Sequence, residues 1–110
     1  MNETEFLTRA SAIMDAIESQ VDDWFENQDI DVEASRQGSS VLNLKFANGR
    51  QVVINTQTPL REMWLAARRG GFHYRFDGQT WKDTRGGPDF DVALSEVCSE
   101  ETGKTLQVSI

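Results

Sequence analysis

The stretch that decides the fold is Val41-Leu-Asn-Leu-Lys-Phe-Ala-Asn-Gly-Arg-Gln-Val-Val-Ile54. From Leu42 to Phe46 apolar and polar side chains alternate, which is the pattern of a strand with one buried face. Asn48-Gly49 follows, and this dipeptide favours the positive φ angles of a type I′ turn. Arg50 to Ile54 is then a second strand. The sequence therefore predicts an antiparallel hairpin closed by a type I′ turn.

Further strands are predicted on both sides of this hairpin. The second hairpin strand must end near Asn55, because Pro59 cannot donate a hydrogen bond to a neighbouring strand. The links between successive strands are short, and all except the one with Pro59 contain glycine. Links of this length allow only antiparallel neighbours. The additional strands are predicted at residues 32–36, 61–67, 72–77 and 80–83.

A long amphipathic helix is predicted before the strands. Its apolar residues recur at steps of three and four, so they lie on one helical stripe. Asn2 or Thr4 could cap its start, and Asn27-Gln28-Asp29 interrupts the pattern at its end. The stripe consists of Phe6, Ala10, Ile13, Met14, Ile17, Val21, Trp24 and Phe25.

A second helix is predicted after the strands. Phe90, Leu94, Val97 and Cys98 recur at helical spacing until Gly103, which favours a helix end. Asp89 precedes this pattern and could cap the helix. In the tail, residues 105–110, Leu106, Val108 and Ile110 alternate with polar residues and could lie along the helices.

One helix, a run of antiparallel strands and a second helix predict an α+β fold. We expect a two-layer α-β sandwich in which both helices pack on one face of an antiparallel sheet of five or six strands. A chain of 110 residues has the length of one domain, so residues 1–110 are assigned to a single domain. The other face of the sheet then meets solvent or a partner.

The composition excludes several classes of protein. A net charge of −7 disfavours nucleic acid and anionic membranes as partners. Neither a signal peptide nor a membrane span fits, since the longest apolar run is only five residues, 63–67. We therefore expect a cytoplasmic protein. The lone cysteine, Cys98, excludes an internal disulfide, and its neighbours predict a buried thiol on a helix.

The negative charge is concentrated near the amino terminus. Residues 1–33 contain ten acidic side chains and one basic side chain, a balance of −9, whereas residues 34–110 have a balance of +2. Helical spacing aligns some of these carboxylates along one edge of the first helix. Three more follow at every second residue, so they would point the same way if their segment belonged to the first strand. The helix edge holds Asp15, Glu18, Asp22 and Glu26, bordered by Asp23, and the strand segment holds Asp29, Asp31 and Glu33.

Such clustered carboxylates repel one another and suit hard cations, which prefer oxygen ligands. Without histidine or cysteine to impose a geometry, the site should be open, weak and poorly selective. The alternatives are a helix face that only keeps the protein in solution, or a negative surface that steers the domain to a basic partner.

No catalytic set can be assembled from the sequence. The one histidine, His73, lies in a predicted strand without a recognisable partner, so it is expected to be a surface residue. No glycine motif follows a strand and opens a helix, so phosphate binding has no support. We therefore expect that the protein is not an enzyme.

A tryptophan on a predicted strand is a candidate partner contact. If Met63 and Leu65 face the core, alternation places Trp64 on the open face of the sheet, beside Asn55 and Gln57. An exposed tryptophan among amides is typical of an interface anchor. If the alternation runs the other way, Trp64 belongs to the core.

Taken together, these motifs resemble the frataxin family, in its bacterial, CyaY-type form. The resemblance extends over nearly the whole chain, and its most specific part is Asn55-x-Gln57-x-Pro59 with Trp64-Leu65. The other matching residues are Asp22-Asp23-Trp24, Asp29-Ile30-Asp31, Val41-Leu42, Phe46, Asn48-Gly49, Val53-Ile54, Ala66, Gly70-Gly71 and Trp81.

The resemblance implies weak binding of Fe(II) or Fe(III) and contact with the cysteine desulfurase and the scaffold protein of iron–sulfur cluster assembly. Partner contacts are implied for Glu18, Asp22 and Asp23, and for the sheet residues Asn55, Gln57 and Trp64. Iron ligands are implied along an acidic ridge that consists of Glu18, Asp22, Asp23, Glu26, Asp29, Asp31 and Glu33.

Three functions follow as hypotheses. The first is an iron-responsive adaptor that regulates iron–sulfur cluster assembly. The alternative is a protein that oxidises and stores iron as oligomers, although no buried di-iron motif is present. The third is an interaction domain that never meets iron. A monomer is expected by default, and iron could drive oligomer formation.

Overall fold

The computed structural model describes residues 1–110 and has two helices, six strands and one short 3₁₀ helix. Its element order confirms the predicted order of helix, strands and helix. The elements in chain order are α1 (Glu3–Asn27), β1 (Val32–Gln37), β2 (Val41–Phe46), β3 (Gln51–Gln57), η1 (Thr58–Leu60), β4 (Glu62–Ala67), β5 (Gly70–Phe76), β6 (Trp81–Asp83) and α2 (Phe90–Thr102).

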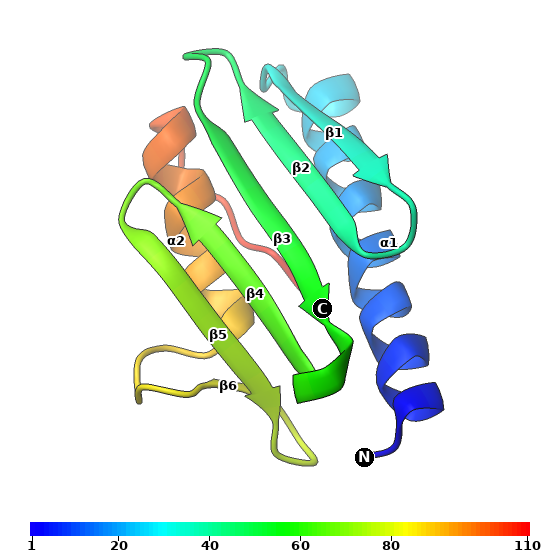
Figure 1. Cartoon of the computed structure of the whole chain (residues 1–110). Coiled ribbons are helices and arrows are strands. Elements are labelled where there is room, and N and C mark those ends of the chain that lie inside the picture. The colour runs from blue at the N-terminus through cyan, green and yellow to red at the C-terminus, as the bar shows by residue number, and fades with distance from the viewer.

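The strands form one antiparallel sheet whose spatial order, β1-β2-β3-β4-β5-β6, is the order along the chain. Both helices lie behind the sheet in Figure 1, and the opposite face is open. This is the predicted α+β two-layer sandwich. Because the links are short, each strand pairs with the strand that precedes it, and the sheet is a meander.

The core lies between the helices and the sheet. Leu42, Leu44 and Phe46 of β2 are buried, as the alternation predicts, and so are Met63 and Leu65 of β4. Helix α1 contributes seven buried residues from its predicted stripe. Phe25 is an exception, since it is 58% exposed. One step of 100° beyond Trp24 carries Phe25 out of the stripe, so its assignment to the core was wrong.

The turn between β2 and β3 differs from the predicted type I′ turn. Only Gly49 has a positive φ, 83°, whereas a type I′ turn needs two such residues. The N–H of Gly49 donates to the carbonyl of Phe46, and the N–H of Phe46 donates to the carbonyl of Arg50. The connection is therefore a three-residue loop with glycine in the left-handed position. Asn48 instead accepts a hydrogen bond from the Arg50 N–H and donates to Glu101.

One strand end differs from the prediction. Strand β3 continues past Asn55 to Gln57, and η1 then holds Pro59 outside the sheet. Strand β1 begins at Val32, as predicted, so Asp29 and Asp31 precede it. Asp29 has a left-handed φ of 56°, which breaks the extended alternation that would have aligned it with Glu33.

Of the helix caps predicted from the sequence, one forms a capping hydrogen bond and the other does not. The side chain of Asn2, rather than Thr4, accepts a hydrogen bond from the N–H of Glu5. Asp89 occupies the N-cap position of α2 but accepts no capping hydrogen bond, and its carboxylate lies 3.4 Å from the Lys82 ammonium. Neither helix is both long and apolar enough to span a membrane.

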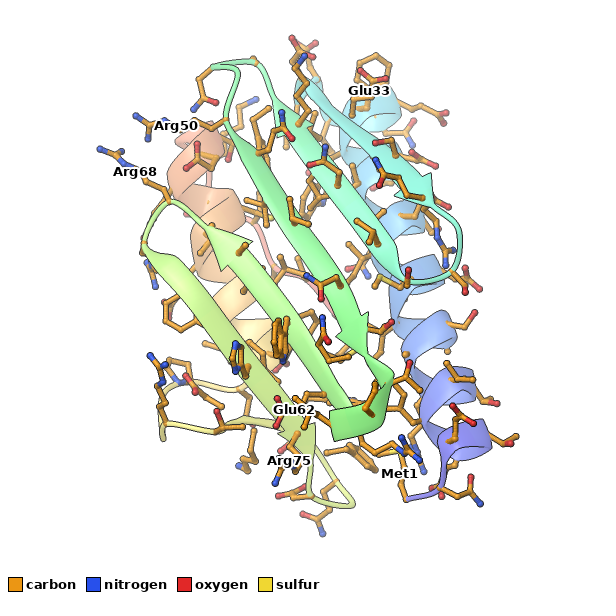
Figure 2. The ribbon with its side chains drawn as sticks, in the orientation of Figure 1. Met1, Glu33, Arg50, Glu62, Arg68 and Arg75 are labelled. Atoms are coloured by element: carbon orange, nitrogen blue, oxygen red, sulfur yellow. The ribbon has the colours of Figure 1, made fainter.

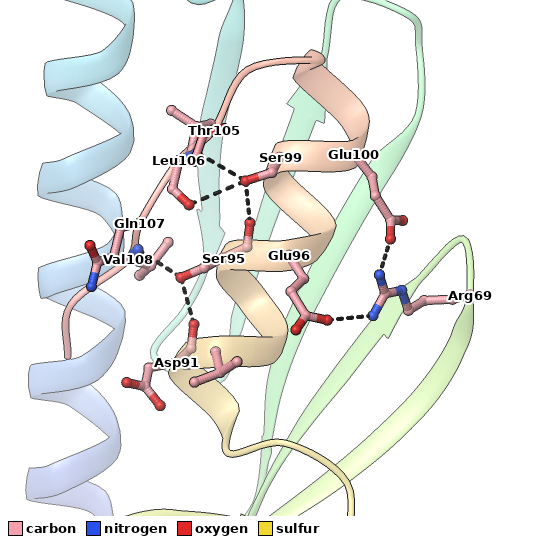
Figure 3. Close-up of a pocket in the computed structure, with 11 residues that line it drawn as sticks. Arg69, Asp91, Ser95, Glu96, Ser99, Glu100, Thr105, Leu106, Gln107 and Val108 are labelled. Atoms are coloured by element: carbon pink, nitrogen blue, oxygen red, sulfur yellow. Dashed lines mark hydrogen bonds and ion pairs between the residues drawn. The ribbon is translucent and has the colours of Figure 1, made fainter.

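The carboxyl-terminal tail lies beside α2 and is fixed by serine hydroxyls (Figure 3). The N–H of Leu106 donates to Oγ of Ser99, and the N–H of Val108 donates to Oγ of Ser95. Leu106 and Val108 are buried as predicted, whereas Ile110 is 46% exposed. The two serines are four residues apart, so successive turns of one helix bind alternate residues of the tail.

We predict that Ser95→Ala and Ser99→Ala each destabilise the protein by about 1–3 kcal/mol, because each leaves a tail N–H at a buried residue without its acceptor. Urea denaturation measures the free energy of unfolding. Ser19→Ala is the matched control, since Ser19 is an exposed helical serine with no such contact. Equal stability of all three variants would show that these bonds do not hold the tail.

Candidate functional site

The exposed side of α1 forms an open acidic groove of about 480 Å³. No apolar side chain lines it. Glu18, Asp22, Asp23 and Glu26, which we call the helix row, share this groove because their spacing returns them to one side of the helix. The full lining is Asp15, Glu18, Ser19, Asp22, Asp23, Glu26 and Asn27, all from α1.

The helix row is not neutralised by basic side chains. None of its four carboxylates forms an ion pair, and Asp23 accepts hydrogen bonds only from the neutral amides of Asn27 and Gln28. The adjacent Asp15 is different, since its Oδ1 lies 2.6 Å from Nη1 of Arg36. The uncompensated charge therefore begins at Glu18.

Of the fourteen carboxylates outside the helix row, seven lie within 4.0 Å of a basic group. Arg69 contacts both Glu96 and Glu100 on α2, as Figure 3 shows. Glu62, Asp89 and Glu101 also lie within 4.0 Å of a basic group. In the helix row, by contrast, four neighbouring carboxylates on one side of one helix all lack an ion pair.

The other three residues of the acidic ridge lie elsewhere. Asp29 and Asp31 line a separate hollow of about 240 Å³ that also contains Glu101 and Lys104. Glu33 is exposed on β1, directly opposite Lys45 of β2. None of the three forms an ion pair within 4.0 Å. The structure therefore brings together four of the seven predicted ligands, and the other three lie outside the groove of the helix row.

No three histidine, cysteine or carboxylate side chains converge closely enough to enclose a metal ion. All four carboxylates of the helix row also come from one helix, so they cannot surround a cation from several sides. Its carboxylates can instead attract a hydrated cation or a basic protein surface over several ångströms. The assignment of Glu18, Asp22, Asp23, Glu26, Asp29, Asp31 and Glu33 as iron ligands stays a prediction.

The open face of the sheet contains a second group of polar and aromatic residues. The strand register places Asn55, Trp64 and His73 in one row across β3, β4 and β5. Met63 and Leu65 are buried against the helices, so Trp64 lies on the opposite face, as predicted. His73 is a half-buried residue of that face, which confirms its predicted surface position.

The tryptophan ring has a defined orientation. The rings of Trp64 and His73 are stacked, with centroids 4.0 Å apart and an interplanar angle of 7°. The indole Nε1–H of Trp64 donates to Oε1 of Glu62 at 3.0 Å. Asn55 accepts a hydrogen bond from the Gln57 amide beside it at 3.1 Å. We call Asn55, Gln57 and Trp64 the docking face; their role in partner binding stays a prediction.

Glu62 is a site residue that the sequence analysis missed. It is the one buried charged residue, and its Oε2 accepts a hydrogen bond from Nη2 of Arg75 at 2.6 Å. Figure 2 shows Glu62 and Arg75 near the same end of the open face. The same alternation that assigns Trp64 to this face assigns Glu62 to it. Its partner Arg75 could not be identified without the register between β4 and β5.

The surroundings of Glu62 favour its ionised form. Burial by itself raises the pKa of this carboxyl, but the hydrogen bonds from Trp64 and Arg75, together with the positive charges of Arg75 and a protonated His73, outweigh burial. The pKa of Glu62 therefore lies below its ordinary value of 4.5.

Cys98 is a buried residue of α2, as predicted, and burial raises the pKa of its thiol to about 12. A thiol of this kind is a poor nucleophile and a poor metal ligand at neutral pH. It belongs to the core and not to either candidate surface.

Comparison with known proteins gives a consistent result. A family model described as a frataxin-like domain matches residues 1–104. The iron-sulfur cluster assembly proteins CyaY of Bordetella petrii and Bordetella pertussis are each 54% identical to this chain over 110 residues, covering all of both sequences. The solved structure of frataxin from Psychromonas ingrahamii matches with a TM-score of 0.79 and 30% identity, covering all of both chains.

We predict that Glu62→Gln lowers the free energy of unfolding at neutral pH and that this difference disappears in acid. A carboxyl whose pKa is lowered by folding stabilises the protein fully above pH 4.5, its unfolded value, and loses that contribution as pH falls through the folded-state pKa. Urea denaturation over a pH series measures the effect, with Glu96→Gln as the control for loss of one exposed charge. A pH-independent difference would contradict the ionised pairing of Glu62.

Proposed function

This chain belongs to the frataxin family, and from that membership we propose that it is an adaptor in iron–sulfur cluster assembly. In this proposal it associates weakly with Fe(II) or Fe(III) along the acidic ridge. It docks on the complex of cysteine desulfurase and scaffold protein through the helix row and the docking face. Iron is cargo, and no catalytic step is assigned to the protein itself.

The free charge of the helix row is the observation that supports this proposal most strongly. Neighbouring like charges destabilise a helix by a few tenths of a kilocalorie per mole for each pair, and Glu18, Asp22 and Glu26 have no basic neighbour to relieve them. Folding stability alone does not favour such a surface. A function that uses uncompensated negative charge accounts for it.

Weak iron binding fits the chemistry of this surface. Carboxylate oxygens suit Fe(III) and Fe(II) as hard or borderline cations, but they come from one exposed helix side without nitrogen or sulfur ligands. Such a site leaves most of the hydration shell of the ion in place. Low affinity and fast release are expected, which suit a protein that passes iron on rather than one that stores it.

Docking on a basic partner uses the same charge. A negative surface attracts a positive one over a distance close to the Debye length and accelerates encounter. The docking face would add short-range contacts, since half-exposed tryptophan and amide groups are typical of interface centres. The helix row and the docking face lie on different layers of the sandwich. A partner complex that consists of two proteins, desulfurase and scaffold, could therefore contact both surfaces.

We predict that reversing Glu18, Asp22 and Asp23 to lysine weakens binding to the desulfurase by roughly a hundredfold, because like charges brought together across an interface cost several kilocalories per mole. Iron binding should also weaken. Isothermal calorimetry with the purified desulfurase, and separately with Fe(II) under anaerobic conditions, measures both effects.

The charge control reverses Glu3, Glu96 and Glu100, three exposed acids outside the helix row, and changes the net charge equally. Because Glu96 and Glu100 pair with Arg69, circular dichroism first confirms that this variant is folded. Its binding should stay close to that of the unaltered protein. Equal loss in both variants would show that net charge, not this surface, matters. Oxygen uptake faster than that of free iron, with growth of oligomers, would instead support the iron-storing alternative.

A further inference from the structure

Glu62 is buried at an unexpected place. Its exposed fraction is 4%, yet it belongs to the open face of the sheet rather than to the core under the helices. Burying a carboxylate is costly unless it is paired and hydrogen-bonded. On an exposed sheet face a neutral residue would avoid that cost. The position of this charge therefore needs an explanation beyond packing.

Both oxygens of the Glu62 carboxylate are used. Oε1 accepts the indole N–H of Trp64 at 3.0 Å, and Oε2 accepts the Arg75 guanidinium at 2.6 Å. Nδ1 of His73 lies 3.9 Å from Oε1. Gln57 and Arg75 are its cross-strand neighbours in β3 and β5. The Arg75 bond fixes the carboxylate, so Oε1 offers the indole an acceptor in one defined place.

This contact completes the orientation of Trp64. The stacked ring of His73 restrains the face of the indole, and the hydrogen bond to Glu62 restrains its Nε1 edge. With both restraints present, the two side-chain torsions of Trp64 are fixed in the free protein. An aromatic anchor that is ordered before binding loses less conformational entropy when the partner docks.

We infer that Glu62 is a positioning residue for the docking face: its buried carboxylate, held by Arg75, keeps the Trp64 indole against His73 in the orientation that the desulfurase–scaffold complex binds. The identity of the partner rests on the proposed function. The positioning of Trp64 does not depend on it, because the contacts exist within this chain.

Two substitutions separate positioning from a general contribution to stability. Glu62→Ala removes both acceptor oxygens and leaves the indole N–H free. Glu62→Gln keeps one acceptor oxygen, which can still bind the indole while Arg75, whose side chain is 62% exposed, turns to solvent. Positioning therefore predicts that glutamine retains much of the Trp64 orientation and that alanine does not. Glu96→Ala is the control for loss of an ion-paired carboxylate on the opposite layer.

The first measurement uses the protein alone. In ¹⁵N-labelled protein, the Trp64 indole N–H signal, assigned with Trp64→Phe, and the nuclear Overhauser contacts between Trp64 and His73 report the orientation of the ring. We expect the contacts to persist in Glu62→Gln and Glu96→Ala and to disappear in Glu62→Ala, with every variant still folded by its backbone spectrum. If Glu62→Ala is unfolded, loss of the Trp64–His73 contacts in Glu62→Leu, which also lacks an acceptor oxygen, replaces it as the supporting result.

The second measurement is binding to the purified desulfurase–scaffold complex by calorimetry. Glu62→Ala should weaken binding by about tenfold, similar to Trp64→Ala, with Glu62→Gln between it and the unaltered protein. Persistence of the Trp64–His73 contacts in Glu62→Ala, or their loss with unchanged binding, would overturn the inference. If the unaltered protein does not bind the complex, the proposed function fails, and the spectra alone decide whether Glu62 positions Trp64.

Discussion

Burial of the apolar stripe of α1 against the sheet is the constraint on which the rest of the structure depends. Phe6, Met14 and Ile17 are completely buried in that contact, so rotating the helix would expose them to water. The same contact forces the residues on the opposite side outwards, where Glu18, Asp22, Asp23 and Glu26 meet solvent without basic neighbours. The exposure of this candidate surface is thus a geometric consequence of the core.

The sheet obeys a similar constraint. Met63 and Leu65 are required by the core, and the two-residue period of a strand then places Glu62 and Trp64 on the open face. The two candidate surfaces are built differently, however. The helix row consists of free charges that act at a distance, whereas the open face contains a charge that is buried, paired and bonded to a tryptophan. We associate the helix row with attraction of iron and a basic partner, and the open face with short-range contacts to that partner.

Periodicity in the sequence was enough to predict the α+β sandwich and its antiparallel strands, but it left open whether Trp64 lies on the open face or in the core. What it could not provide was local backbone geometry and register. The left-handed Asp29 ends the alternation that had grouped Asp29, Asp31 and Glu33, and the single positive φ at Gly49 changes the hairpin turn. The Glu62–Arg75 pair joins residues 13 apart and depends on how β4 and β5 align, which no local pattern specifies.

We propose that free negative charge on the helix row draws this protein to a basic partner. The most direct test is the ionic-strength dependence of the affinity for the desulfurase–scaffold complex, measured by calorimetry from low to high salt. Surface charge is screened beyond about 10 Å at 0.1 M salt, so we expect a steep fall in affinity, mainly through slower association. An affinity that stays constant across the salt series would contradict it.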